Sequence, residues 1–258
     1  MTVTSELEQD WRSWHAQREA DLNTDHGWLT VVAFNWLTSV PSAIEGLPGR
    51  WWTDGRFAHV DAAGLILDGE PLNGTASASV AEAGSLGWLY YGDKLAELVL
   101  RGGRYAIRQR DPKAATRLGF SGVPAYPVDP RWVTTGHFTP LAGGERVEVA
   151  TARPDLRQHV TVVGTVHLAL DESAYELVAT AAGDGKLSLS FHDETNGVET
   201  AAWRTVTTGV VQGDRSVVVD FNRTINLPFA FTDYGTCPAP VEGNSLPLTV
   251  TAGEKSPR

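Results

Sequence analysis

The sequence predicts a mostly β protein with one N-terminal helix followed by two β units. Apolar runs of strand length recur from residue 28 to residue 251, and Gly, Asn and Asp turn pairs separate them. Helical spacing of apolar residues marks only the N-terminal segment. Residues 113–130 contain three prolines and few periodic positions, so we interpret them as the connection between the two β units.

Residues 1–26 are predicted to form a helix that packs on the body of the protein. Ser5 followed by Glu8 is the pattern of a capping box, in which each side chain bonds the other residue's backbone N–H. Trp11 and Trp14 recur at a helical spacing and are expected to face the protein. The charged side chains are expected to face solvent: Glu8, Arg12, Arg18 and Glu19.

The first β unit is predicted over residues 27–112 and the second over residues 131–258. Gly183-Asp184-Gly185 and Asn196-Gly197 are typical hairpin turns of the second unit. Evenly spaced short strands favour a β-sandwich first, and then an antiparallel barrel or a second sandwich.

Composition and net charge indicate a protein with a substantial core and limit the kinds of molecule that it is expected to bind. The chain is 42% hydrophobic with nine tryptophans, which is enough apolar material for a substantial core. Its formal net charge of −10 argues against a nucleic-acid partner. Basic residues do cluster over residues 101–110, but Arg104, Arg108 and Arg110 share a period of two. We interpret them as the solvated face of a strand.

Membrane, disulfide, metal and cofactor sites are not predicted. No run approaches the roughly 18 apolar residues of a membrane span, and no apolar leader follows Met1, so we expect a cytoplasmic protein without a membrane partner. One cysteine excludes an intrachain disulfide and a multi-cysteine zinc site. The seven histidines form no metal-binding pattern, and we expect no cofactor.

The candidate site lies in residues 217–255, where an apolar run ends in polar residues and a proline-rich segment follows. Polar groups in irregular backbone beside a rigid strand are a common way to present a site. We predict three residues for acid–base chemistry: Asp220, Glu254 and Lys255. Six more are predicted to bind a small-molecule substrate: Asn222, Arg223, Asn226, Tyr234, Cys237 and Asn244.

Two interpretations of this segment stay open. In one, Asp220 or Glu254 is a general base and Arg223 or Lys255 holds an anionic group in a polar, metal-independent cleft. In the other, the Asp and Asn side chains bond the backbone of the loop, where prolines supply no N–H. The lone Cys237 is interpreted either as a packing residue or as a nucleophile.

Several short motifs resemble those of the DUF1684 family, whose function is not established. They are DFNR, N-x-P, CP-x-P, N-x-LP and AGEK near the C-terminus, with GWLTVVAFNWL, GGRYAIRQRDP and YPVDP upstream. Their order and spacing extend the resemblance over most of residues 10–255. The resemblance implies a shared fold and little chemistry.

Residues 49–74 resemble a degenerate forkhead-associated (FHA) domain. Gly49-Arg50, His59 and Asn73-Gly74 fall near the positions of the FHA pattern, but Arg56 stands where a phosphate-binding serine is expected. The resemblance implies an FHA-like sandwich kept for packing. A protein-interaction module acting through this unit, or a structural accessory without a ligand, is the alternative to small-molecule binding.

Overall fold

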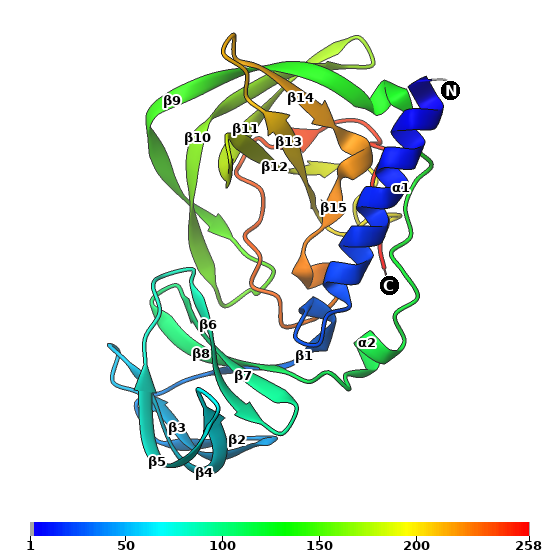
Figure 1. Ribbon diagram of the computed structural model, residues 1–258. Helices are drawn as coiled ribbons and strands as arrows, with labels where there is room; N and C mark the ends of the chain where they lie inside the picture. Colours follow the sequence, from blue (N-terminus) through cyan, green and yellow to red (C-terminus); the bar gives the residue numbers. More distant parts are fainter. Residues whose placement is uncertain (1–2, 258) are drawn as a thin grey trace. The chain divides into compact units, whose positions relative to one another are not determined.

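A computed structural model describes residues 3–257, and it divides the chain into two compact units (Figure 1). The larger unit contains the chain up to Ala20, Gly122–Phe231, and the chain from Cys237 onward. The smaller unit contains Asp21–Ser121 and Thr232–Thr236. Each unit is built on an eight-stranded sheet, and strand is the dominant structure, so the mostly β prediction is confirmed.

The smaller unit is one antiparallel sheet in the order β1-β8-β7-β6-β4-β3-β2, with β5 paired to β4. The sheet is nearly barrel-shaped, and its core includes Trp51 and Trp88, whose rings meet edge to face at 5.8 Å. Its elements are η1 (Trp28–Thr30), β1 (Val31–Trp36), β2 (Ser42–Ile44), β3 (Leu47–Thr53), β4 (Ala58–Leu67), β5 (Glu70–Ala78), β6 (Ser85–Tyr91), β7 (Lys94–Arg101), β8 (Arg104–Arg110) and α2 (Ala115–Leu118).

The segment compared with FHA domains forms β3, β4 and the start of β5. Arg56 is exposed in the turn between β3 and β4. His59 stacks on Trp52 and bonds Ser77 through Nδ1 at 2.6 Å. The FHA-like character of this segment and protein binding through its surface stay predictions.

Strand β8 corrects the prediction of a solvated arginine face. Arg104 is exposed, but Arg108 and Arg110 are 1% and 7% exposed. β8 is a central strand between β1 and β7, and aromatic side chains cover the face that carries these two arginines. The guanidinium carbon of Arg108 lies 4.7 Å from the Trp28 ring and 5.9 Å from the Phe34 ring.

The larger unit is a sheet in the order β14-β9-β10-β11-β12-β13-β15, with β16 paired in parallel to β12. All its other strand pairs are antiparallel. Its elements are α1 (Val3–Leu22, of which the last two residues belong to the smaller unit), η2 (Pro130–Trp132), β9 (Val133–Ala150), β10 (Arg157–Leu170), β11 (Ser173–Gly183), β12 (Lys186–Asp193), β13 (Arg204–Val210), β14 (Ser216–Asp220), η3 (Phe221–Arg223), β15 (Ile225–Asn226), η4 (Pro228–Ala230) and β16 (Ser245–Leu246).

The sheet of the larger unit uses both of its faces. Along β12, Leu187, Leu189 and Phe191 belong to the main core, whereas the alternate residues Ser188 and Ser190 lie half-buried on the second face. The segment after Cys237, drawn in orange to red in Figure 1, covers part of that second face. The alternating pattern of β12 predicts one buried face, but the structure covers both faces of this strand.

Helix α1 begins before the predicted cap, because Val3 is already helical and Ser5 lies inside the helix. The capping-box prediction at Ser5 is therefore wrong. The prediction that Trp11 faces the protein is confirmed, because Trp11 Nε1 donates to the Asn222 carbonyl at 2.6 Å. Arg18 and Glu19, predicted to face solvent, instead bond to groups of the larger unit. None of the described helices is long and apolar enough to cross a membrane.

Candidate functional site

Asp220 and Asn222 bind together the turn that follows β14. Asp220 Oδ1 accepts from the Asn222 backbone N–H at 3.0 Å and from Asn222 Nδ2 at 2.9 Å. Asn222 also donates to the Asp129 carbonyl at 3.1 Å and accepts from the Asp129 N–H at 3.0 Å. These bonds join η3 to the chain that precedes η2, so both predicted residues hold irregular backbone in place.

Arg223 connects η3 to α1. It forms an ion pair with Asp10, and its guanidinium lies 5.4 Å from the Trp14 ring. A longer contact of 3.5 Å joins Arg223 Nε to Asp220 Oδ2. The predicted anion-binding residue is thus already paired with carboxylates of its own chain.

Glu254 and Asn226 form a buried cluster with Arg18. Glu254 Oε2 accepts from the Asn226 N–H at 2.6 Å, and Glu254 Oε1 accepts from Arg18 Nε at 3.2 Å. The chain reaches this position through Gly253 (φ +75°), where a Cβ would stand 2.4 Å from the Thr224 carbonyl oxygen. Burial raises the pKa of the Glu254 carboxyl, and Arg18 opposes only part of that effect.

Lys255 points to different partners from its neighbour Glu254. Its ammonium lies 2.9 Å from Glu199 Oε2 and 4.4 Å from the centre of the Tyr126 ring. The hydrogen bond to Glu199 raises the pKa of Lys255, so this lysine is a protonated cation at neutral pH. Its backbone carbonyl accepts from Asn226 Nδ2 at 2.7 Å.

Asn244 joins two strands where they separate. β11 and β12 pair only from Thr180 and Ser188 to their connecting turn. Beyond that point the Asn244 side chain bridges them: Oδ1 accepts from the Val178 N–H at 2.8 Å, and Nδ2 donates to the Val178 and Ser190 carbonyls at 2.9 Å each. The amide therefore replaces backbone pairing between the strands.

The last two predicted residues, Tyr234 and Cys237, are not part of these clusters. Tyr234 belongs to the short stretch Thr232–Thr236 of the smaller unit, and its N–H donates to Thr232 Oγ1 at 3.3 Å. Cys237 is 8% exposed in the larger unit, and its carbonyl accepts from the Ala152 N–H at 2.9 Å. Within residues 3–257, no group of three or more His, Cys, Asp or Glu side chains is placed to hold a metal ion.

Two neighbouring cavities open on the second face of the larger sheet. The first, about 180 Å³, lies between β10–β13 and the segment from Pro238 to Asn244. The second, about 370 Å³, extends along β9 and β10 to Glu145 and Glu242. Both are lined by Val178 and Val241, so we treat them as one groove, the β10–β13 groove. Asn244 is the predicted site residue that lines it.

A row of hydroxyl groups forms the polar wall of the β10–β13 groove. Ser188 Oγ lies 3.0 Å from Thr205 Oγ1, and Ser190 Oγ donates to the same oxygen at 3.3 Å. Thr205 Oγ1 itself donates to the Leu189 carbonyl at 3.3 Å. Ser190 gives its hydrogen to Thr205, so its oxygen keeps its lone pairs for another partner, whereas either oxygen can be the donor between Ser188 and Thr205.

The polar cluster of the smaller unit was not predicted from the sequence. Glu97 on β7 lies 3.2 Å from Arg108 Nη1 and 2.8 Å from Arg110 Nε on β8. The available signal was Glu97 itself, a charged residue within the apolar run Leu95–Val99, because a buried carboxylate requires a partner.

Comparison with known proteins places the chain in a family. The family described as "Protein of unknown function (DUF1684)" matches residues 118–255. A solution NMR structure of an uncharacterized protein from Haloarcula marismortui is 26% identical, with 54% of this chain and 78% of that chain covered and a TM-score of 0.45. No curated protein matches the chain.

Proposed function

Because this chain belongs to the DUF1684 family, whose function is unknown, we propose a function from its own groups: the larger unit binds a small molecule in the β10–β13 groove. The observation that carries the proposal is the row of hydroxyl oxygens facing a cavity with apolar walls. Small-molecule sites combine mainly apolar walls with a few well-placed polar groups, and they occupy about 300–1,000 Å³. The two cavities of 180 and 370 Å³ together are of that size.

The polar groups of the groove define the chemistry of the ligand. Ser190 offers an acceptor oxygen, which favours a ligand with a hydrogen-bond donor. The exposed carboxylates of Glu145 and Glu242 at the other end favour a cationic group over an anionic one. A molecule with an apolar body and amino or hydroxyl groups fits both ends.

The proposal concerns binding and includes no reaction. The groups predicted for acid–base chemistry, Asp220, Glu254 and Lys255, are not among the lining residues of either cavity. Their side chains bond to Asn222, Arg18 and Glu199, respectively. Asn244 connects the prediction to the groove, because its amide holds the strands that form the wall.

Methyl NMR of the full chain with labelled valines tests this proposal. Hexylamine, used as the probe, is expected to shift the methyl signals of Val178 and Val241 saturably, and hexanoate is expected to leave them in place. The exposed Val210, outside the groove, is the internal control.

A blocking substitution checks that the response comes from the groove. Val241→Trp fills the space shared by the two cavities and should abolish the hexylamine shift at Val178. Val198→Trp, at a valine that is 83% exposed, is the matched control and should keep the shift. Equal responses to amine and carboxylate, or a response that survives Val241→Trp, would overturn the proposal.

A further inference from the structure

The smaller unit contains two buried arginines that share one carboxylate. Arg108 and Arg110 both contact Glu97 Oε2, at 3.2 and 2.8 Å. Burial of a charge is costly unless the charge is paired and hydrogen-bonded. With two guanidinium groups to one carboxylate, this cluster keeps a positive charge that Glu97 does not neutralise.

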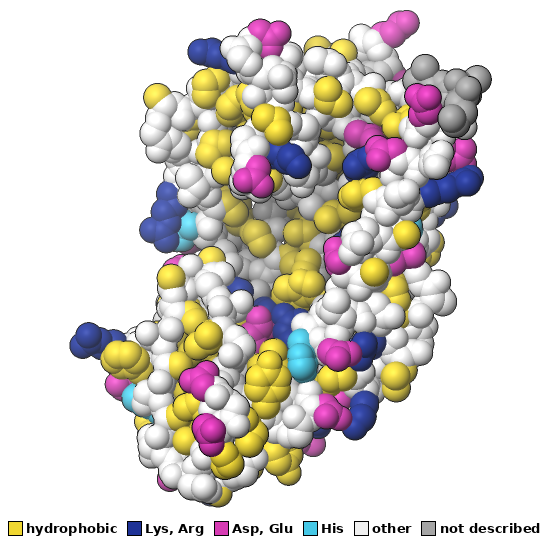
Figure 2. Space-filling model, in the orientation of Figure 1, with side chains coloured by type: hydrophobic (Ala, Val, Ile, Leu, Met, Phe, Trp, Pro, Cys, Tyr) yellow, Lys and Arg dark blue, Asp and Glu magenta, His cyan; other side chains and the backbone are white. Residues whose placement is uncertain are grey.

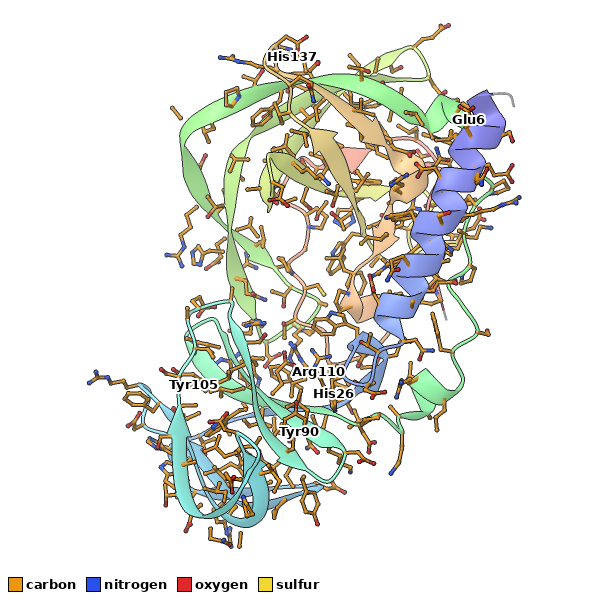
Figure 3. The ribbon with its side chains drawn as sticks, viewed as in Figure 1. Glu6, His26, Tyr90, Tyr105, Arg110 and His137 are labelled. Carbon is orange, nitrogen blue, oxygen red and sulfur yellow. The ribbon has the colours of Figure 1, made fainter. Side chains whose placement is uncertain are left out.

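Arg110 is well satisfied within the unit. Besides Glu97, its Nη1 donates to the His26 and Gly27 carbonyls at 2.9 and 2.8 Å. Figure 3 shows Arg110 close to His26. We therefore assign the excess positive charge of the cluster to Arg108.

Arg108 is poorly satisfied. Its Nη1 is 3.2 Å from Glu97, its Nη2 is 3.4 Å from Thr236 Oγ1, and its Nε has no partner among the described residues. Burial lowers the pKa of Arg108 to about 10, and the nearby charges of Arg110 and Arg101 act in the same direction. Since that pKa still lies well above 7, Arg108 is a cation at neutral pH.

A second arginine converges on the same point. Arg101 Nε donates to Thr236 Oγ1 at 3.3 Å, so Arg101 and Arg108 both point at one oxygen atom. The Trp28 ring lies 4.7 Å from Arg108 and 4.8 Å from Arg110 and forms an apolar wall beside both. Two guanidinium groups directed at one oxygen beside an aromatic wall are an arrangement suited to an anion.

We propose that Arg108, supported by Arg101 and Arg110, binds the oxyanion of a small molecule, a carboxylate or phosphate group, in the smaller unit. A guanidinium presents donors in a planar fork that matches two oxygens of such a group. The carboxylate of Glu97 is already shared by two arginines, so an oxyanion would offset positive charge that Glu97 leaves on Arg108.

The proposal is for a local site and not for a basic surface. The formal net charge of the chain is −10, and acidic and basic side chains are interspersed on the face shown in Figure 2. A nucleic-acid backbone requires many exposed Lys and Arg contacts, whereas Arg108 is 1% exposed. One buried fork favours a single terminal carboxylate or phosphate.

Binding measurements on the full chain test the proposal, with inorganic phosphate and acetate as probes and chloride as the control anion at equal ionic strength. Phosphate, acetate or both should raise the Tm saturably, because a ligand of the folded state stabilises it by mass action. Chloride should have no saturable effect. A chain that responds equally to all three anions, or to none, overturns the proposal.

Substitutions of Arg108 and Arg104 test whether the anion binds at Arg108. Arg108→Met should weaken binding of the active probe by about tenfold or more, and Arg108→Lys should also weaken it because the charge remains but the fork is lost. Arg104→Gln, which removes an exposed arginine of the same strand, should leave the affinity within about twofold. Unchanged affinity in Arg108→Met contradicts the assignment. If that variant does not fold, the anion comparison on the unaltered chain decides.

Discussion

Two arginines, one in each unit, are buried to the same extent but satisfied very differently. Arg204 of the larger unit is 0% exposed and forms an ion pair with Asp193 at 2.8 Å. It also donates to the carbonyls of Val250, Ala252 and Glu254 at 2.9, 2.6 and 3.1 Å. Arg108 of the smaller unit is 1% exposed and shares the Glu97 carboxylate with Arg110. Its hydrogen bonds, 3.2 Å to Glu97 and 3.4 Å to Thr236, both go to side chains.

This difference distinguishes an arginine that stabilises the fold from one that can bind a ligand. Arg204 neutralises a carboxylate and joins β13 to the C-terminal segment, so its bonds are complete within the chain apart from Nε. Arg108 keeps both charge and donor capacity. Burial alone therefore does not identify a functional arginine; the balance of charge and the length of its bonds do.

Arg204→Met should have the largest effect on stability. The substitution leaves Asp193 buried without its cation and three carbonyls without a donor, so we expect a loss of about 3–5 kcal/mol in the free energy of unfolding. Arg108→Met should change it by only about 1 kcal/mol or less, because Arg110 still neutralises Glu97. Denaturant unfolding measures both, and equal losses would remove the distinction.

Asn244→Ala should cause the next largest loss of stability. It removes three hydrogen bonds that join β11 and β12, and we expect a loss of about 2–3 kcal/mol. Hydrogen exchange should also show faster exchange of the Val178 amide. Asn23→Ala, at an exposed position, should stay within about 0.5 kcal/mol. A similar loss in both variants would contradict the bridging role.

The carboxylates should give opposite pH responses. Burial raises the pKa of Glu254, so the folded state holds the proton more tightly, and the contribution of Glu254 to stability should rise as the pH falls below its folded pKa. Burial acts in the same direction on Glu97, but Arg108 and Arg110 outweigh it and lower the pKa. The stability that Glu97 contributes is therefore present above its unfolded pKa and is lost as the pH falls through the folded value.

Unfolding free energies of Glu254→Gln and Glu97→Gln, each subtracted from those of the unaltered chain between pH 4 and 7, measure these slopes. The difference for Glu254 should grow toward low pH, and the difference for Glu97 should shrink. Slopes of the same sign would show that the two environments do not differ as described.

Arg12→Gln should have the smallest effect. Arg12 pairs with Glu8 at 2.6 Å on α1, but the two side chains are 70% and 46% exposed. Solvent screens such a pair, so we expect about 0.5 kcal/mol or less by denaturant unfolding. A loss comparable to that of Arg204→Met would mean that burial does not govern the energies compared above.

The sequence was most informative where a regular period or a short run of residues carries the signal. Trp11 and Trp14 predicted the buried side of α1, and the short run from Asp220 to Asn222 predicted side chains able to bond nearby backbone. The DUF1684 motifs within residues 118–255 predicted the family. The tryptophans follow a helical period, and Asp220 and Asn222 are two residues apart.

The sequence was least informative where a distant segment covers a face. A period of two placed Arg108 and Arg110 on one side of β8 but could not show that Trp28 and Phe34 cover that side. Ser188 and Ser190 have the same ambiguity, because the segment that covers them lies some fifty residues later in the chain. Alternation defines a face, and only tertiary structure defines what lies on it.

The most direct test of this account is an arginine side-chain ¹H–¹⁵N NMR spectrum during a phosphate titration, with Arg108→Met and Arg204→Lys used for assignment. The account predicts that the Arg108 Nε–Hε signal shifts saturably while the Arg204 signal stays in place. Movement of neither signal, or equal movement of both, would contradict it.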